Sequence, residues 1–423
     1  MRILFVSNYY PPCRYAWGYQ QLCEEVADGL HAKGHDIAIL TSTYSDNSDT
    51  AHPYPVYRVL PIDPDWNSGQ SAAVQFFVGR RKRERQALAS LQEVVETYHP
   101  DVIFFWDTVG LYKSLLPKAE QLLNTSVVYY FADYLPEFAD QYVAYWRNRP
   151  VHWLTRFLKQ PLAALALYML AHERRSPLPR YEHCICVSNY VCQRLVSQGF
   201  IPESSVVIHN GVDLAIFSSD RRFASTSQPQ QLRCLIAGRV TPEKGIHTVV
   251  EAFGMLQAQE ADNITSITLT ILGSGPDDYA ARLREQVAAH HLEEIVKFRV
   301  PVPREHMPEV LKQYDALVLA SEHAEPLARA IQEAMAMGLL VIGTITGGSG
   351  ELLVHEKTGF VFESGDPKSL AAQLERALHN RDLAGQLAEQ GQKAVEQYFN
   401  IHRTVEQVET YLVDLIRRKA AEA

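Results

Sequence analysis

Short, continuous apolar runs recur along the chain, and segments with helical periodicity separate them. Apolar runs without polar alternation are expected for strands that are buried on both faces of a parallel sheet. Strand followed by helix, repeated many times, predicts a doubly wound α/β architecture. In the first half of the chain the predicted strands are residues 2–7, 35–42, 102–107, 126–131, 183–188 and 205–211.

The pattern stops at a polar segment and then begins again. Residues 218–231 lack periodicity and predict a linker. We therefore expect one domain in residues 1–217 and a second in 218–400, with a last helix in 401–423 that could pack back on the first domain. Ligands of such sheets bind beyond the carboxyl ends of the strands, so the natural site is the cleft between the two domains. The strands predicted in the second domain are residues 232–238, 266–275, 295–300, 314–321 and 339–344.

Composition excludes several classes of protein. The formal net charge of −9 over 423 residues gives no overall basic field, which argues against nucleic acid as a partner. The six cysteines have no paired-doublet spacing, so a zinc site or a disulfide framework is not expected. The apolar start of the chain stops at prolines and predicts a first strand in place of a signal peptide. These features predict a cytoplasmic protein.

Two segments are compatible with contact at a membrane surface. No apolar run reaches the length of about 18 residues that a membrane-spanning helix needs. Residues 156–175 have an apolar centre with basic flanks, which fits a helix packed on a neighbour or an interfacial helix. The basic run at residues 76–85 would help the second arrangement. A peripheral position at the inner membrane face is therefore an alternative location.

The segment LIAGRVTPEKG, residues 235–245, combines a strand end with glycine and two cations. Gly238 allows a close backbone approach, and Arg239 and Lys244 lie on either side of a turn before a helix that begins near Ile246. Cations at a strand end beside a helix N-terminus suit a phosphate group. A turn that carries surface cations is the alternative.

A pair of glutamates lies eight positions apart, in AEPLARAIQEAMAMG at residues 324–338. Glu325 follows a predicted strand, Pro326 suits a first helical turn, and Glu333 would lie about 12 Å further along a straight helix. Groups that far apart cannot act on one atom, but they could hold the two ends of an elongated ligand. A glutamate near a helix start and another in mid-helix are also common without any ligand.

Three further motifs have weaker chemistry. The glycines at residues 347–350 follow a strand, and their backbone amides could approach a ligand. Residues 273–276, GSGP, lack the third glycine of a dinucleotide loop and predict a plain turn. Asp63 and Asp65 flank a proline, as in an acidic turn or in the aspartate pair with which some sugar transferases hold a metal.

Taken together, these segments resemble the family-4 retaining glycosyltransferases of the GT-B fold over nearly the whole chain. The family's E-x7-E motif matches Glu325 to Glu333, and its phosphate-binding pair matches Arg239 and Lys244. Other matching segments are VVIHNGVD (206–213), LGSGP, YDALVLAS, GTITGGSGELL and the opening stretch from Asn8 to Ser42. The resemblance implies two Rossmann-like domains that face each other across a cleft.

The resemblance also implies the reaction. A sugar would move from a UDP-, GDP- or ADP-sugar to a sugar-containing or lipid acceptor, as in glycan biosynthesis, with retained anomeric configuration. Neither a cofactor nor a metal would be needed, because Arg239 and Lys244 would neutralise the leaving diphosphate. Glu333 would hold the ribose and Glu325 the donor sugar. The backbones assigned to the diphosphate are those of Gly18, Gly238, Leu327, Ala328 and Arg329.

The chain departs from the family pattern at several positions. Many members have a histidine before an aspartate where this chain has Ala132 and Asp133, and we hypothesise that Asp133 takes over part of that catalytic role. Trp17 replaces the first of two glycines, and Ala328 replaces another, a mild change for a helical backbone. These departures keep two alternatives open. One is a non-catalytic sugar-nucleotide-binding homologue or partner subunit, and the other is a different GT-B enzyme such as a nucleotide-sugar epimerase.

Overall fold

The computed structural model describes most of the chain. The predicted linker at 218–231 falls largely outside the described residues, and so does Trp17. The described ranges are residues 1–16, 18–46, 52–122, 126–138, 140–148, 153–173, 178–219, 231–259 and 267–422.

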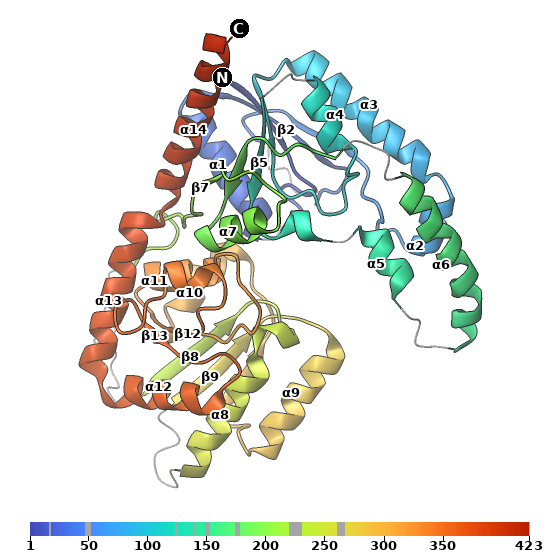
Figure 1. The fold of residues 1–423 in the computed structure, drawn as a ribbon. Helices are drawn as coiled ribbons and strands as arrows, with labels where there is room; N and C mark the ends of the chain where they lie inside the picture. Colours follow the sequence, from blue (N-terminus) through green and yellow to red (C-terminus); the bar gives the residue numbers. More distant parts are fainter. Residues whose placement is uncertain are drawn as a thin grey trace. The chain divides into compact units, whose positions relative to one another are not determined.

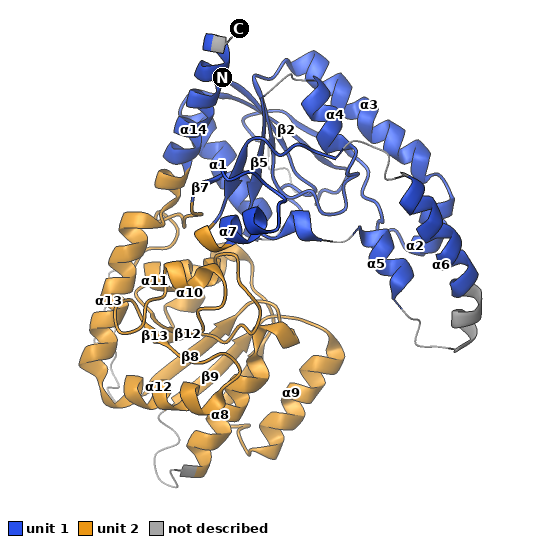
Figure 2. Ribbon diagram, viewed as in Figure 1, with its two compact units in different colours: residues 1–187, 191–208, 405–423 blue, residues 188–190, 209–404 orange. Residues whose placement is uncertain are grey.

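The chain forms two compact α/β units, shown in different colours in Figure 2. Unit 1 comprises residues 1–187, 191–208 and 405–423, and unit 2 comprises residues 188–190 and 209–404. Each unit is built on its own parallel sheet with helices connecting the strands (Figure 1).

Unit 1 contains a seven-stranded parallel sheet in the order β3-β2-β1-β4-β5-β6-β7. The order reverses direction between β1 and β4, so the carboxyl ends of these strands mark the switch point at which doubly wound sheets bind ligands. The strands are β1 (Arg2–Val6), β2 (Asp36–Ser42), β3 (Val56–Leu60), β4 (Val102–Phe105), β5 (Val127–Phe131), β6 (Cys184–Cys186) and β7 (Val206–Val207).

The helices of unit 1 lie between these strands in the sequence. The first, α1, turns Leu22, Val26 and Leu30 into the core at helical spacing. The helices are α1 (Gly18–Ala32), α2 (Ala72–Phe77), α3 (Arg80–Tyr98), α4 (Leu115–Leu122), the 3-10 turn η1 (Leu135–Glu137), α5 (Gln141–Arg147), α6 (Trp153–Glu173) and α7 (Asn189–Ser197).

Unit 2 contains a six-stranded parallel sheet in the order β10-β9-β8-β11-β12-β13. Here the switch point lies between β8 and β11, the two strands whose loops contain Arg239, Lys244 and Glu325. The strands are β8 (Leu232–Ala237), β9 (Ile267–Leu272), β10 (Val296–Arg299), β11 (Ala316–Leu319), β12 (Leu340–Gly343) and β13 (Phe360–Val361).

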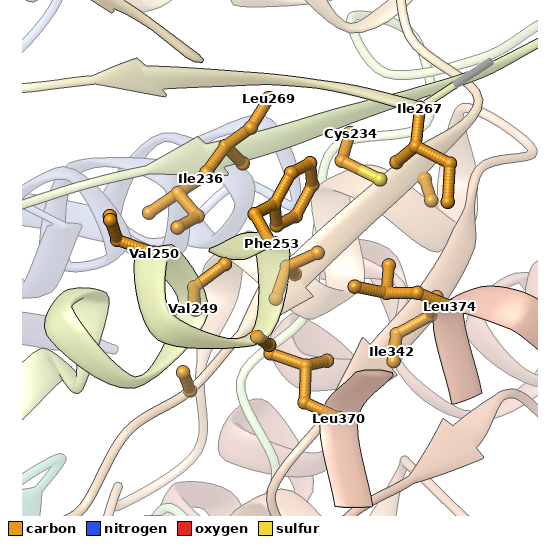
Figure 3. Close-up of a cluster of buried hydrophobic side chains, with 14 of the residues drawn as sticks. Cys234, Ile236, Val249, Val250, Phe253, Ile267, Leu269, Ile342, Leu370 and Leu374 are labelled. Carbon is orange, nitrogen blue, oxygen red and sulfur yellow. The ribbon is translucent and has the colours of Figure 1, made fainter. Parts of the chain in front are cut away.

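The core of unit 2 forms where helices cover this sheet. Phe253 of α8 and Leu370 and Leu374 of α12 pack against strand residues such as Ile236 and Ile342 (Figure 3). The helices and 3-10 turns are η3 (Pro242–Lys244), α8 (Ile246–Gln259), α9 (Asp277–Ala289), η5 (Arg304–His306), α10 (Met307–Leu311), α11 (Arg329–Ala336), η6 (Gly348–Glu351), α12 (Pro367–His379) and α13 (Arg381–Tyr398).

The sequence predicted eleven of the strands, and β3 and β13 were missed for different reasons. Strand β3 lies at the sheet edge and is mostly half-exposed, and its central Arg58 interrupts the apolar run. Strand β13 consists of two residues, which is too short for any periodicity. Both strands are recognisable only from their pairing with β2 and β12.

The last helix, α14 (Ile401–Glu422), enters unit 1 at Val405. Lys33 and His35 each place a nitrogen 2.8 Å from a carboxylate oxygen of Glu409. A β-carbon at Gly29 of α1 would lie 2.5 Å from Cγ2 of Val405. Glycine is therefore needed for the close approach of α1 and α14.

The contact between α1 and α14 predicts the effect of a larger side chain. Gly29→Val should destabilise unit 1 by about 1–3 kcal/mol because the added methyl groups overlap Val405. Gly29→Val combined with Val405→Ala should be less destabilised than the sum of the two single variants. Urea unfolding of the three variants measures this. Simple additivity would contradict the close packing.

Candidate active site

The loop after β8 has an open backbone and an exposed cation. Gly238 has a φ of +143°, and no atom lies within 4 Å of the place where a β-carbon would project. The Arg239 side chain is 60% exposed, and its Nη1 lies 3.7 Å from Oε1 of Glu243. An anion that approaches this strand end would meet both the exposed backbone and the guanidinium group.

Lys244 ends the 3-10 turn η3, which closes on Gly245. Gly245 has a φ of +62°, and a β-carbon there would lie 2.0 Å from the carbonyl oxygen of Ala320. Only glycine permits this contact between the turn and the end of β11. The contact brings Lys244 beside Glu325.

Lys244, which is partly exposed, forms an ion pair with the buried Glu325. Oε1 of Glu325 accepts hydrogen bonds from Nζ of Lys244 and from Oγ of Ser321. Burial acts to raise the pKa of Glu325, but the charge of Lys244 and these hydrogen bonds hold it below its ordinary value. Glu325 is therefore ionised at neutral pH, and the charge of Lys244 is balanced by it. The sequence indicated both residues but not their pairing, and it did not indicate Ser321.

The glycine turn after β12 holds the backbone of Glu325 in place. The N–H of Glu325 donates to the carbonyl of Thr346 over 3.2 Å, and the N–H of Gly348 donates to the carbonyl of Glu325 over 2.7 Å. A β-carbon at Gly347 would lie 2.3 Å from that carbonyl oxygen. The expectation that these glycines present amides to a ligand is thus wrong for Gly348, because its amide is used by the neighbouring loop.

Helix α11 begins later than the sequence predicted. Ala328 is its N-cap, with φ −72° and ψ 111°, and the helix starts at Arg329. Pro326 is therefore not in the first helical turn, and Ala328 is extended and not helical. Glu325 pairs with Gly347 in an isolated parallel bridge, and Pro326 and Leu327 bend before the helix begins. The predicted 12 Å spacing of the glutamates, which assumed a straight helix, does not apply.

Glu333 lies on α11 between two arginines. Its Oε1 is 3.2 Å from Nη1 of Arg304 and 4.0 Å from Nε of Arg329. Arg304 follows β10 in η5 and was not identified from the sequence. Its position after a predicted strand was the available signal, because residues at carboxyl ends of parallel strands approach the site. Leu327, another predicted donor contact, is buried.

In unit 1, Asp133 follows β5 and Gly18 follows β1. Gly18 is the first residue of α1, and Asp133 lies two residues beyond β5. Oδ1 of Asp133 accepts from the N–H of Leu135 over 2.9 Å. Asp107, which follows β4, accepts from Nε2 of Gln20 over 2.8 Å. The sequence did not indicate Asp107, although it ended a predicted strand.

The two aspartates of unit 1 influence each other electrostatically. Burial raises the pKa of Asp133 to about 8, and the negative charge of Asp107 adds to the rise. Burial also raises the pKa of Asp107, to about 6, against hydrogen bonds that lower it. Asp133 therefore carries its proton near neutral pH and can donate a hydrogen bond.

The Asp63–Asp65 motif serves a packing role. Carboxylate oxygens of Asp63 lie 2.7 Å from the hydroxyl of Tyr142, 3.0 Å from Arg83 and 3.4 Å from Arg80. Tyr44 donates a hydrogen bond to Asp65. Within the part of the chain that the structure describes, no three His, Cys, Asp or Glu side chains gather as metal ligands. These contacts favour the acidic turn over the metal pair.

Comparison with known proteins identifies the family. A family model described as Glycosyltransferase Family 4 matches residues 18–216, and one described as Glycosyl transferases group 1 matches residues 218–394. The two models adjoin each other and together span most of the chain. The chain belongs to the group 1 / family 4 glycosyltransferases.

Named relatives of this glycosyltransferase match over part of its length. A putative glycosyltransferase, YtcC of Bacillus subtilis, is 27% identical over 55% of this chain and 60% of its own length. A putative colanic acid biosynthesis glycosyltransferase, WcaL of Salmonella typhimurium, is 30% identical over 51% of this chain and 52% of its own. The chain thus spans little more than half the length of these relatives.

A solved structure shows the same fold over the full length. HepE of Anabaena, crystallised with UDP-glucose, is 20% identical, covers 98% of this chain and 100% of its own, and has a TM-score of 0.66. The fold of this glycosyltransferase is accordingly GT-B, with two Rossmann-like units, as the sequence predicted.

The ion pair of unit 2 predicts a pH-dependent loss of stability. Lys244→Met should cost about 3–5 kcal/mol at neutral pH, because it leaves the buried Glu325 carboxylate without its cation. In wild type, the pKa of Glu325 is lower in the folded state than in the unfolded chain. The ion pair therefore contributes its full stability above the unfolded-state pKa, and this stability is lost as the pH falls through the folded-state pKa. The difference in unfolding free energy between variant and wild type should therefore shrink as the pH falls below the ordinary pKa of a glutamate. Chemical unfolding at several pH values measures it.

A second substitution controls for the lost lysine packing. Lys244→Met with Glu325→Gln should recover most of the stability at neutral pH, since no buried charge remains unpaired. If the double variant were as unstable as Lys244→Met alone, the loss would come from packing and not from the pair.

The raised pKa of Asp133 makes a prediction of opposite sign. The folded state keeps this proton up to about pH 8 while the unfolded chain loses it near pH 4, so stability falls as the pH rises through this window. Asp133→Asn accepts the Leu135 hydrogen bond but cannot ionise. Its Tm relative to wild type should increase between about pH 5 and pH 8, by on the order of a few degrees. Asp278→Asn on the exposed face of α9 is the control, and an equal trend there would contradict the assignment.

Proposed function

We propose that this glycosyltransferase moves a sugar from a nucleoside-diphosphate donor to an acceptor hydroxyl, with retention of configuration and without a metal ion. UDP-, GDP- and ADP-sugars are the candidate donors. The acceptor is proposed to be a glycan, a lipid-linked sugar or a small molecule. We place the protein in the cytoplasm, with the inner membrane face as its working position if the acceptor is a lipid.

The observation that carries the proposal is the arrangement of Arg239 and Lys244 at the switch point of unit 2. Both cations follow β8, and Lys244 reaches the loop after β11 through Glu325. Two cations at such a strand end can stabilise the charge that develops on a leaving diphosphate. In other enzymes a divalent metal does this work.

The glutamates divide the donor between them in this proposal. Glu333, on α11, holds the ribose hydroxyls, and the nearby Arg304 and Arg329 orient its carboxylate. Glu325 contacts hydroxyls of the donor sugar. The backbone from Leu327 to Arg329 and at Gly238 faces the diphosphate.

Because Lys244 is already bonded to Glu325, binding of the donor must disturb an existing ion pair. Nζ of Lys244 already donates to Glu325. A diphosphate must share or replace that partner, and a donor whose sugar hydroxyls bind Glu325 compensates the exchange. The complete nucleotide-sugar is therefore a better ligand than the nucleoside diphosphate alone.

Asp133 is proposed as a hydrogen-bond donor to the reacting sugar. Its proton is retained near neutral pH, so it can donate where an ionised carboxylate could only accept. A histidine has this capacity in many members of the family, and Ala132 lacks it.

The names of the related proteins narrow the substrate class. HepE binds UDP-glucose, which supports a uridine donor. WcaL is named for colanic acid biosynthesis, which supports a growing glycan as acceptor. Because the chain matches only about half of WcaL, both remain part of the proposal.

The test is release of nucleoside diphosphate from UDP-, GDP- and ADP-sugars, with product configuration read by NMR and chelator present. Arg239→Ala should lower kcat/KM on the order of 10²-fold without loss of Tm. The matched control is Arg282→Ala, an exposed arginine of unit 2 that also pairs with an acid four residues away.

Four results would contradict the proposal. Tight donor binding without turnover, with sugar and lipid-linked acceptors present, would favour the non-catalytic homologue. Inverted product configuration, or activity that disappears with the chelator, would exclude the proposed mechanism. Conversion of the donor without transfer would favour an epimerase.

A further inference from the structure

Large apolar side chains gather on the exposed faces of two helices in unit 1. Figure 1 shows α2, α5 and α6 as a group set apart from the sheet. They share a small core of their own, in which Phe76 of α2, Trp146 of α5 and Leu170 of α6 are buried. Among the side chains that the structure describes, the exposed apolar ones on α2, at its C-cap and on α6 are Val74, Phe77, Val78, Leu162, Leu165 and Tyr168.

Helix α6 is apolar on both of its faces. Ala166 and Leu170 face the small core, whereas Leu162, Leu165 and Tyr168 are 43%, 50% and 62% exposed on successive turns. Residues 160–171 include no charged side chain. A helix that is apolar all round is stable only where something covers its second face.

Cations border this apolar surface directly. Helix α3 begins at Arg80, immediately after the exposed Phe77 and Val78. Arg80 and Arg83 pair with the buried Asp63. The exposed cations of the same helical turns are Arg81, Lys82 and Arg85.

The start of α3 is positively charged, whereas the chain as a whole has a negative net charge. Residues 80–85 contain five cations and one acid, in a chain whose formal net charge is −9. The acid, Glu84, accepts a hydrogen bond from Ser114. An apolar face with a basic margin complements an anionic lipid surface, where acyl chains lie beneath negative headgroups.

We infer that the exposed faces of α2 and α6, with the basic start of α3, dock on an anionic lipid bilayer. Leu162, Leu165 and Tyr168 enter the boundary between headgroups and acyl chains, and Lys82 and Arg85 contact the headgroups. The protein lies on the bilayer and does not cross it. No helix in the described ranges is long and apolar enough to span a membrane.

A second copy of the chain fits this surface less well. In a two-fold dimer the same face meets itself, so the cations of α3 in one copy would come close to those of the other. A bilayer that contains acidic lipids supplies the missing negative charge. This inference concerns where the protein works and does not depend on the transfer reaction.

The test is sedimentation of the full-length protein with vesicles, without any sugar nucleotide. Wild type should bind vesicles of equal parts phosphatidylglycerol and phosphatidylcholine and should bind phosphatidylcholine alone far more weakly. Replacing Leu162, Leu165 and Tyr168 by Gln should lower the partition coefficient on the order of 10²-fold. Each cation removed at Lys82 and Arg85 should lower it on the order of fivefold, and only on the anionic vesicles.

Matched variants distinguish binding through this surface from nonspecific adsorption of other exposed apolar residues. Ile216, Val300 and Tyr398 are exposed apolar residues of unit 2, and their replacement by Gln should leave vesicle binding unchanged. Equal loss in this control would overturn the inference, as would wild type that fails to sediment with anionic vesicles. A wild-type dimer that the α6 variant converts to monomer, with vesicle binding unaltered, would assign the surface to a second copy and overturn it too.

Discussion

The ion pair between Lys244 and the buried Glu325 is the interaction on which the geometry of unit 2 depends. It joins the loop after β8 to the loop after β11 at the switch point of the sheet. Glycines at 245 and 347 make the approach possible, because a β-carbon at either position would overlap a backbone oxygen. A pair of this kind is a weak source of stability but a strong constraint on position, since removing one partner leaves an uncompensated charge. The pair therefore fixes the two groups that the proposed donor would meet.

The two units provide different chemistry. Unit 2 places cations beside its carboxylates, with Lys244 at Glu325 and with Arg304 and Arg329 at Glu333. Unit 1 does the reverse at Asp133, where burial and a neighbouring aspartate keep a proton on the carboxyl group. Such opposite environments are typical of sites that divide anion binding from hydrogen-bond donation. The apolar face of α6 adds a third property, which we propose is docking at a lipid surface.

The sequence predicted the two α/β units and the residues at the strand ends, because uninterrupted apolar runs and their order along the chain can be read directly from the sequence. It failed where tertiary contacts override local preference. Pro326 suited a helix start, yet Glu325 pairs with Gly347, the chain bends at Pro326 and Leu327, and the helix begins only at Arg329. The glycines near 347 were assigned to a ligand, but Gly348 bonds the neighbouring loop. Arg304 and Asp107 lie far in sequence from Glu333 and Asp133, so only the folded chain reveals those neighbours.

The central claim is that Lys244 is paired with Glu325 until the donor binds, when the diphosphate takes Lys244 and the sugar hydroxyls take Glu325. One calorimetric comparison tests this directly. Glu325→Gln frees Lys244 for phosphate while weakening the contact with sugar hydroxyls. Its affinity for the nucleoside diphosphate should rise relative to wild type, and its affinity for the matching nucleotide-sugar should fall. If both affinities fell together, or if neither changed, Glu325 would not compete for Lys244 and the account of the donor site would be wrong.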